Sequence, residues 1–174
     1  QQIGIRTIFN LVGPLANPAG TKRQLVGVFD KVWVEPLAHV LDRLGLERAW
    51  VVHGYDGMDE ITTTGPTYVA ELKDGKVSCF EVTPKDAGLA CAAAESLLGG
   101  EAEENATIIR SLLDGEKGPQ RDIVLLNSAA ALVISGRTGD LAAGVELAAQ
   151  AIDDGKSRET LEKLVAITNG SPPP

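Results

Sequence analysis

An aspartate and a glutamate stand side by side at Asp59 and Glu60, after a glycine-rich turn that closes an apolar run, VVHGYDGM at residues 51–58. Neighbouring side chains point to opposite faces of a regular strand, whereas on a loop both carboxylates can turn toward one ion. Mg²⁺ suits such a pair, because it takes one or two carboxylates and leaves its other positions to water and phosphate oxygens. The pattern predicts a Mg²⁺ site at these two residues, and a solvated Asp-Gly hairpin turn is the alternative interpretation.

A loop near the start of the chain is a second candidate. Gly13 and Pro14 together offer a flat apolar wall against which an aromatic ring could lie, although an ordinary connector explains the same residues. Arg6, Lys22 and Arg23 could meet phosphate, because arginine gives a bidentate fork and lysine a point charge. Isolated basic residues are commonly solvated, so none of the three defines a site by itself.

Other reactive side chains are interpreted as structural. His53 ends the apolar run and could act as a general base, but we interpret it as holding a backbone or carboxylate hydrogen bond. Asn127 lies among small residues and is expected to satisfy a backbone group inside the domain. Cys79 and Cys91 lack metal-ligand spacing and are expected to be reduced, buried thiols. The sequence has no G-x-S-x-G, HExxH, GxGxxG or P-loop motif, so we assign no catalytic residue.

Length and composition are those of a globular protein. The 174 residues normally form one domain, and 44% of them are hydrophobic. A formal net charge of -8 argues against a nucleic-acid partner, which would need a basic face. No apolar run approaches the ~20 residues of a membrane span, and we expect a cytoplasmic location. Because the chain starts with Gln1 and its single methionine is Met58, we expect it to be a piece of a longer protein.

The acidic pair must be positioned by a strand that ends just before it. Residues 24–29 and 49–53 are short, branched apolar runs typical of buried strands, and residues 34–44 between them carry apolar residues at helical spacing. This order predicts a βαβ unit, and open α/β sheets bind ligands at the carboxyl ends of their strands. Two alternating runs, at 67–72 and 76–82, flank a hairpin signal, so the sheet is expected to be mixed.

The second half of the chain has helical patterns that end at glycines. Helices are expected at residues 105–113, 121–135, 141–153 and 157–167. The predicted fold class is α/β, with a mixed, mostly parallel sheet flanked by helices. One domain is expected over residues 1–169, in which residues 4–12 finish a helix, and a disordered tail is expected at 170–174.

Five segments in chain order resemble the C-terminal α/β domain of the anthranilate phosphoribosyltransferase family. They are GIRTIFNLVGPLANP at 4–18, VVHGYDGMDE at 51–60, PKDAGL at 84–89, NA at 105–106 and RDIVLLNSAAAL at 121–132. The first two are quite specific, and the others support them. The family usually has an acidic residue and Phe where Lys85 and Ala87 stand, and Ala more often than Ser128, but none of these departures touches the expected metal site.

The resemblance implies an enzyme that joins anthranilate to phosphoribosyl diphosphate and releases diphosphate, in tryptophan biosynthesis. It implies a domain of the nucleoside phosphorylase/phosphoribosyltransferase type, in which Asp59 and Glu60 hold Mg²⁺ and Gly13 and Pro14 line the anthranilate channel. In the family, a Gly-rich phosphate loop and the helical domain that makes the homodimer interface lie upstream. The resemblance therefore implies that this chain is inactive by itself.

Two other functions of the same architecture stay open. A pyrimidine nucleoside phosphorylase-like enzyme partly shares the segment at residues 4–18, and a non-enzymatic nucleic-acid-binding relative would keep the fold. The acidic pair in its particular setting favours the anthranilate enzyme over the first. The net charge of -8 disfavours the second.

Overall fold

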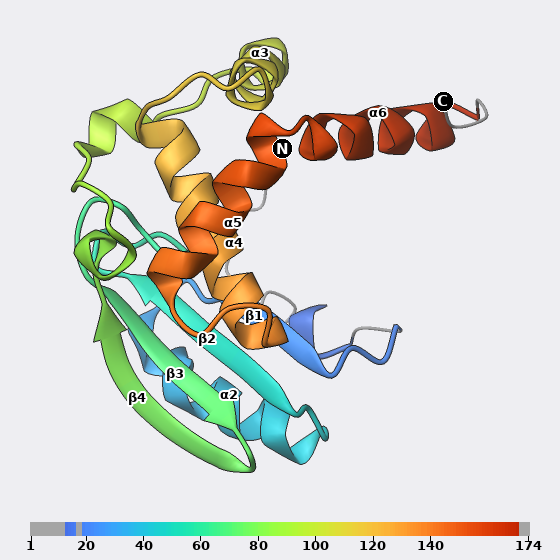
Figure 1. Cartoon of the computed structure of the whole chain (residues 1–174). Coiled ribbons are helices and arrows are strands. Elements are labelled where there is room, and N and C mark those ends of the chain that lie inside the picture. The colour runs from blue at the N-terminus through green and yellow to red at the C-terminus, as the bar shows by residue number, and fades with distance from the viewer. Residues whose placement is uncertain (1–12, 17–18, 171–174) are drawn as a thin grey trace, which may run out of the picture.

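The fold is a four-stranded sheet with helices on both faces (Figure 1). The computed structural model describes residues 13–16 and 19–170, and for Pro14 the backbone only. The strands are β1 (Arg23–Gly27), β2 (Arg48–Gly54), β3 (Thr67–Lys73) and β4 (Lys76–Val82). The α-helices are α2 (Val34–Arg43), α3 (Ala102–Leu113), α4 (Pro119–Ser135), α5 (Leu141–Asp153) and α6 (Lys156–Thr168). Short 3-10 helices are η1 (Gly13–Leu15), η2 (Lys31–Trp33), η3 (Pro84–Ala87) and η4 (Ala94–Leu97).

The strand order is β1-β2-β3-β4, and the sheet is mixed. Strand β1 pairs with β2 in parallel across α2, from Arg23 opposite Arg48 to Gly27 opposite Val52. Strands β2, β3 and β4 pair in antiparallel order. The α/β class and the mixed sheet are confirmed, but the expectation of a mostly parallel sheet is wrong for the described strands. The reason is that one βαβ unit gives one parallel pair, whereas the long β2–β3 connection and the β3–β4 hairpin each give an antiparallel one.

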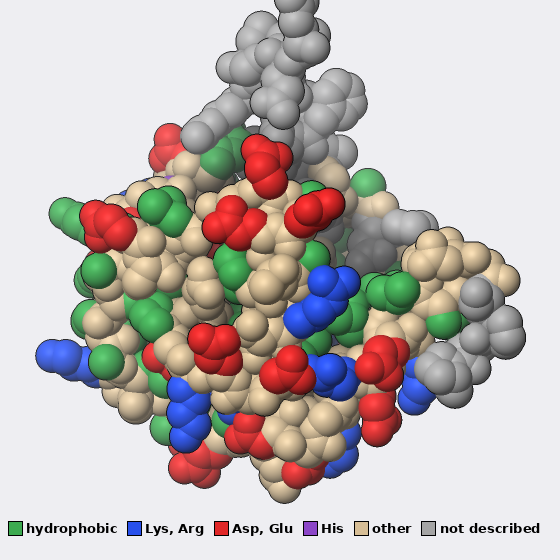
Figure 2. Space-filling model, turned by 90° about the horizontal axis from the view of Figure 1, so that it is seen from above, with side chains coloured by type: hydrophobic (Ala, Val, Ile, Leu, Met, Phe, Trp, Pro, Cys, Tyr) green, Lys and Arg blue, Asp and Glu red, His purple; other side chains and the backbone are tan. Residues whose placement is uncertain are grey.

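The outer surface carries both signs of charge. Figure 2 looks down on the end of the molecule where Figure 1 places α3 and α6, and Asp and Glu side chains are spread across this face. Lys and Arg side chains lie among them and are not gathered into a patch on this face. None of the helices in the described part of the chain is long and apolar enough to cross a membrane.

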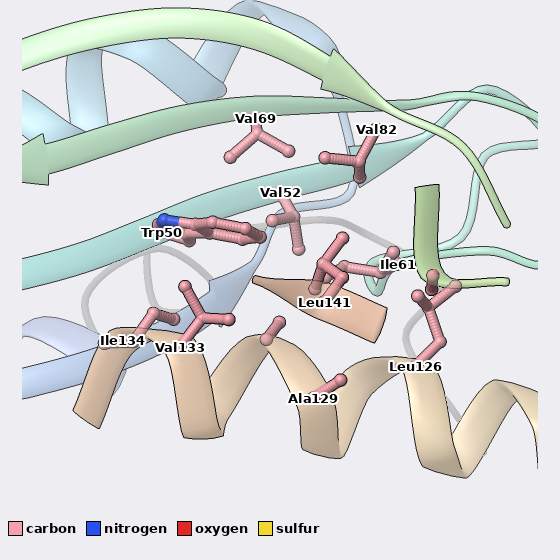
Figure 3. Packing of buried hydrophobic residues seen from close by; sticks show 12 residues of the cluster. Trp50, Val52, Ile61, Val69, Val82, Leu126, Ala129, Val133, Ile134 and Leu141 are labelled. Carbon is pink, nitrogen blue, oxygen red and sulfur yellow. The ribbon is translucent and has the colours of Figure 1, made fainter. Parts of the chain in front are cut away.

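Strand β2 is buried on both faces, and it is apolar at every position from Ala49 to Val52. Trp50 and Val52 point to one side, where they pack with Leu126 and Val133 of α4 (Figure 3). Ala49 and Val51 alternate to the other side, where α2 covers them. This two-sided burial is the reason that the strand reads as a continuous apolar run instead of an alternating one.

Most helix and strand predictions are confirmed to within one or two residues, and α5 spans the range expected from its sequence. The predicted glycine ends are also present: Gly45 and Gly136 follow α2 and α4 with φ of +80° and +76°. Helix α3 begins three residues before its expected start. The prediction missed this start because the N-cap residue, Glu101, makes no side-chain capping hydrogen bond and is not a typical N-cap residue. The expected helix at 4–12 and all of the expected tail except Gly170 lie outside the described residues.

The prediction of buried thiols is wrong, since Cys79 and Cys91 are both free and exposed. Cys79 lies on β4, an edge strand of the sheet, in which Val82 is the only buried residue. Alternation in β4 therefore does not separate a core face from a solvent face, because helices do not cover this strand as they cover β2.

Helices α4 and α5 approach closely at a glycine. A Cβ built at Gly144 would lie 2.7 Å from Ala129 Cβ and 2.8 Å from Ala129 Cα. We expect Gly144→Ala to lower the free energy of unfolding by about 1–2 kcal/mol, because overpacking outweighs the better helix propensity of alanine. Urea unfolding measures the change. Gly139→Ala is the control, since its Cβ would meet nothing within 4 Å, and equal stability of the two variants would contradict the prediction.

Candidate functional site

The chain makes a compact turn where β2 ends at the carboxyl edge of the sheet. The Gly54 N–H donates to the Met58 carbonyl at 2.8 Å, and the Gly57 N–H donates to the Gly54 carbonyl at 2.9 Å. Gly57 has φ of +93°, a conformation that favours glycine. The connection to β3 runs on to residue 66, so this turn is not the tight hairpin of the alternative interpretation. Asp59 and Glu60 leave the turn on an irregular backbone, as predicted.

Asp56 fixes the turn by accepting hydrogen bonds with both carboxylate oxygens. Its Oδ1 accepts from the Met58 N–H at 3.1 Å, and its Oδ2 accepts from the hydroxyls of Thr62 and Thr64 at 2.6 Å each. Partial burial of Asp56 opposes its ionisation, but these hydrogen bonds outweigh that effect and hold the pKa of the carboxyl below its ordinary value. Asp56 therefore stays charged and ties the start of the loop to its end.

The backbone of Asp59 lies against Gly27 of β1. A Cβ built at Gly27 would fall 1.6 Å from the Asp59 carbonyl oxygen, so no side chain fits between the strand and the loop. The Asp59 side chain is exposed. This close approach seats the acidic pair against the carboxyl end of the parallel strand pair, where α/β sheets bind ligands.

Glu60 is positioned by its buried neighbour in sequence and by a hydrogen bond from helix α4. The next residue, Ile61, is fully buried in the core between β2 and α4 (Figure 3). Asn127 of α4 donates to Glu60 Oε2 at 3.3 Å, and no described residue donates to Oε1. Burial raises the pKa of Glu60 above its ordinary value, and the charges of Asp59 and Asp56 raise it further. The charges of Asp59 and Asp56 thus both oppose ionisation of Glu60 at this edge, a condition that a bound cation would relieve.

The raised pKa of Glu60 predicts how the free energy of unfolding depends on pH when no metal is added. The folded state binds the Glu60 proton more tightly than the unfolded chain, so the stability that this carboxyl contributes is present below its ordinary pKa of 4.5. That stability is lost as the pH rises through the raised folded pKa. We therefore expect Glu60→Gln to increase the free energy of unfolding near pH 7, and the difference from the parent to disappear below about pH 4.

Urea unfolding of both proteins across this pH range measures the effect. Asp56 contributes the opposite trend, since its low folded pKa removes stability as the pH falls, but Asp56 is present in both proteins. A variant that is less stable than its parent at neutral pH would show that the Glu60 charge is favourably paired in the absence of metal.

Other polar residues gather at the same edge. His53 Nδ1 lies 2.8 Å from the Val28 carbonyl, which confirms the backbone role expected for this histidine. Lys31 Nζ lies 3.3 Å from the centre of the Tyr68 ring, and Tyr68 stands opposite His53 in the sheet. Sequence reasoning did not single out Lys31, although its position just after β1 was the signal that could have found it.

Two of the basic residues considered for phosphate lie elsewhere. Lys22 donates to the Gly45 carbonyl at 3.1 Å, where β1 begins. Arg23 donates to the Ser135 carbonyl and pairs with Glu47 at 3.7 Å. Both are therefore at the amino end of the parallel strands, and the structure does not bring them to the acidic pair. Arg6 lies outside the described residues.

The structure does not bring Gly13 to the acidic pair. Gly13 begins η1, whose Leu15 packs into the α2 side of the core and lines a small cavity with Lys22 and Leu46. These neighbours mark the amino end of β1 and β2, whereas Asp59 follows the carboxyl end of β2. The seven residues of β2 separate the two ends by roughly 20 Å. The Pro14 side chain lies outside what the structure describes.

No group of three or more His, Cys, Asp or Glu side chains within the described ranges is arranged to hold a metal ion. A two-carboxylate site, completed by water and phosphate oxygens, is the arrangement that these residues could make for Mg²⁺. The backbone role expected for Asn127 is confirmed by its hydrogen bonds with Ile61, but sequence reasoning missed its contact with Glu60. Only its polarity within an apolar helix pointed to it.

Comparison with known proteins agrees with this architecture. The model of the glycosyl transferase family, a/b domain, matches residues 1–158. Anthranilate phosphoribosyltransferase of Azospirillum brasilense is 62% identical over 170 residues, which are 98% of this chain and 48% of that protein. The enzyme of Parvibaculum lavamentivorans is 62% identical over 168 residues, 97% of this chain and 49% of that protein. The chain therefore spans about half the length of these curated relatives.

Solved structures of anthranilate phosphoribosyltransferases resemble most of this chain. The crystal structure of anthranilate phosphoribosyltransferase from Thermus thermophilus superposes with a TM-score of 0.85 at 44% identity, covering 94% of this chain and 48% of that chain. The Saccharomyces cerevisiae enzyme in complex with PRPP and Mg gives a TM-score of 0.82 at 27% identity, over 91% of this chain and 46% of that one. The same yeast enzyme in complex with 4-fluoroanthranilate gives 0.83 at 26% identity, over 91% and 47%. The resemblance found in the sequence is confirmed, and the chain belongs to the glycosyl transferase family as a bearer of its a/b domain.

Proposed function

We propose that this chain is the C-terminal part of an anthranilate phosphoribosyltransferase, which transfers phosphoribosyl from phosphoribosyl diphosphate to anthranilate in tryptophan biosynthesis. The observation that carries the proposal is the acidic pair at residues 59 and 60, seated by Gly27 and Asn127 at the ligand-binding edge of the sheet. High identity to anthranilate phosphoribosyltransferases over nearly all of this chain supports it. A nucleoside phosphorylase gains no support from these relatives.

For the metal, we propose that Asp59 and Glu60 hold Mg²⁺, as the yeast relative solved with PRPP and Mg suggests. The residues fit this role, since Glu60 Oε1 receives no hydrogen bond from the described residues and the charges of Asp59 and Asp56 oppose the ionisation of Glu60. When bound, Mg²⁺ would neutralise the charge that develops on the leaving diphosphate. The protein's own part is to hold both carboxylates at one place and to keep the loop from moving.

The absence of an assigned nucleophile is compatible with this chemistry. The sugar carbon under attack becomes oxocarbenium-like as the diphosphate leaves, so the reaction needs no covalent bond to the protein. It needs the aromatic amine to be positioned near that carbon. We keep Gly13 and Pro14 as the prediction for the anthranilate channel, although Leu15, in the same 3-10 helix as Gly13, packs at the opposite end of β2 from Asp59. The homodimer and the absence of a nucleic-acid partner also stay predictions.

The intact protein that carries this chain should form product from anthranilate, phosphoribosyl diphosphate and Mg²⁺, and none from a pyrimidine nucleoside and phosphate. We expect the 174 residues by themselves to form no product, because they span about half the length of their relatives. Following the consumption of anthranilate by fluorescence measures both. Turnover by the 174-residue chain alone would contradict the second expectation and leave the first intact.

A further inference from the structure

The side-chain amide of Asn127 forms hydrogen bonds with both backbone polar groups of Ile61, the residue that follows the acidic pair. Asn127 Oδ1 accepts from the Ile61 N–H at 3.0 Å, and Asn127 Nδ2 donates to the Ile61 carbonyl at 2.8 Å. The same Nδ2 donates to the Ile123 carbonyl at 3.0 Å and to Glu60 Oε2 at 3.3 Å. We propose that Asn127 is a positioning residue for the metal pair, which fixes the place of the Glu60 carboxylate from helix α4.

The orientation of the amide follows from its partners. Two carbonyl oxygens and a carboxylate oxygen surround Nδ2, and a backbone N–H faces Oδ1. Exchanging the oxygen and the nitrogen would place the amide oxygen against three acceptors and leave the Ile61 N–H facing a donor, so the network admits one orientation.

The contact to Glu60 is the longest of the four, and two amide hydrogens serve three acceptors. Asn127 therefore acts on Glu60 chiefly through the backbone of Ile61, whose two polar groups it holds, and secondly through an Nδ2 hydrogen that it shares between Glu60 Oε2 and a carbonyl. Because the Ile61 side chain is fully buried and α4 packs against β2, the grip ties the loop to a rigid support. No described residue donates to Glu60 Oε1, which is the oxygen that would face the cation.

The inference rests on the proposed function, since it concerns the residues offered as metal ligands. Replacing a residue that hydrogen-bonds a metal ligand typically lowers metal affinity by about 10–100-fold. We therefore expect Asn127→Ala to weaken the binding of Mn²⁺, used as a probe for Mg²⁺, about tenfold in the intact protein. Electron paramagnetic resonance of the free ion measures this affinity, and hydrogen exchange of the Ile61 amide, expected to become faster, reports the lost grip.

Ser135→Ala, at the far end of the same helix α4, is the control. Ser135 Oγ donates to the Leu132 carbonyl at 2.9 Å, so this variant also removes a side-chain hydrogen bond to backbone, but it does so beside Arg23, at the amino end of the parallel strands. We expect this control to leave Mn²⁺ affinity within about twofold of the parent. Asn127→Asp serves as a second variant, because it keeps the shape and the acceptor for Ile61 but not the donors.

Combination with Glu60→Gln decides whether Asn127 acts through Glu60. If it does, Asn127→Ala should weaken Mn²⁺ binding no further in the Glu60→Gln background. Unchanged Mn²⁺ affinity in Asn127→Ala, or losses that multiply in the double variant, would overturn the inference. Unfolding of both Asn127 variants would also overturn it, by assigning the residue to the fold. If Glu60→Gln alone binds Mn²⁺ as tightly as the parent, the proposed metal site fails instead.

Discussion

Replacing Asp59 with Asn and Glu60 with Gln together is expected to lower Mg²⁺-dependent transfer by roughly a thousandfold while the protein stays folded. A metal contributes several kcal/mol of charge stabilisation at a leaving group, and each 1.36 kcal/mol is a factor of ten in rate. The two substitutions keep the shape of both side chains. The fold should survive, because Asp59 is exposed and the repulsion around Glu60 is removed.

Steady-state rates measured across a Mg²⁺ titration, together with urea unfolding of the same preparation, separate the two effects. Saturating Mg²⁺ should restore little of the rate if the pair holds the metal. Unfolding of the double variant would mean that the pair is structural, and a rate close to that of the parent would remove the metal proposal altogether.

Gly27→Ala should destabilise the protein by about 3 kcal/mol and weaken metal binding at the same time. The added Cβ would lie 1.6 Å from the Asp59 carbonyl oxygen and 2.5 Å from its carbonyl carbon, so backbone must move. Overpacking of this kind typically costs about 1–3 kcal/mol, and here the part that yields is the loop that carries the acidic pair, not the strand pair β1–β2.

The matched control is Gly65→Ala, in the connection between β2 and β3, where a Cβ would meet nothing within 4 Å. Urea unfolding and Mn²⁺ binding should change in the Gly27 variant and stay near the parent values in the Gly65 variant. A Gly27 variant that lost stability but kept its metal affinity would show that the strand yields in place of the loop.

Local patterns were enough to predict the elements. The apolar run before His53, the helical spacing after Val34 and the glycines that follow the helices each depend on residues close in sequence, so their signals are readable without a fold. The count of parallel pairs was not predictable in this way, because it depends on which strands come to lie side by side. The exposure of Cys79 likewise depends on which helices cover β4.

The acidic pair, the turn before it and the resemblance to anthranilate phosphoribosyltransferases were determined by the sequence alone, since they rest on residue types in unbroken order. Only the tertiary structure decided what holds the pair. Asn127 is 67 residues from Glu60 along the chain, and Gly27 meets Asp59 from another strand. The structure also placed Lys31 at this edge and kept Lys22 and Gly13 away from it. The physical reason is that sequence patterns report local conformation, whereas a site is made by close packing between distant segments.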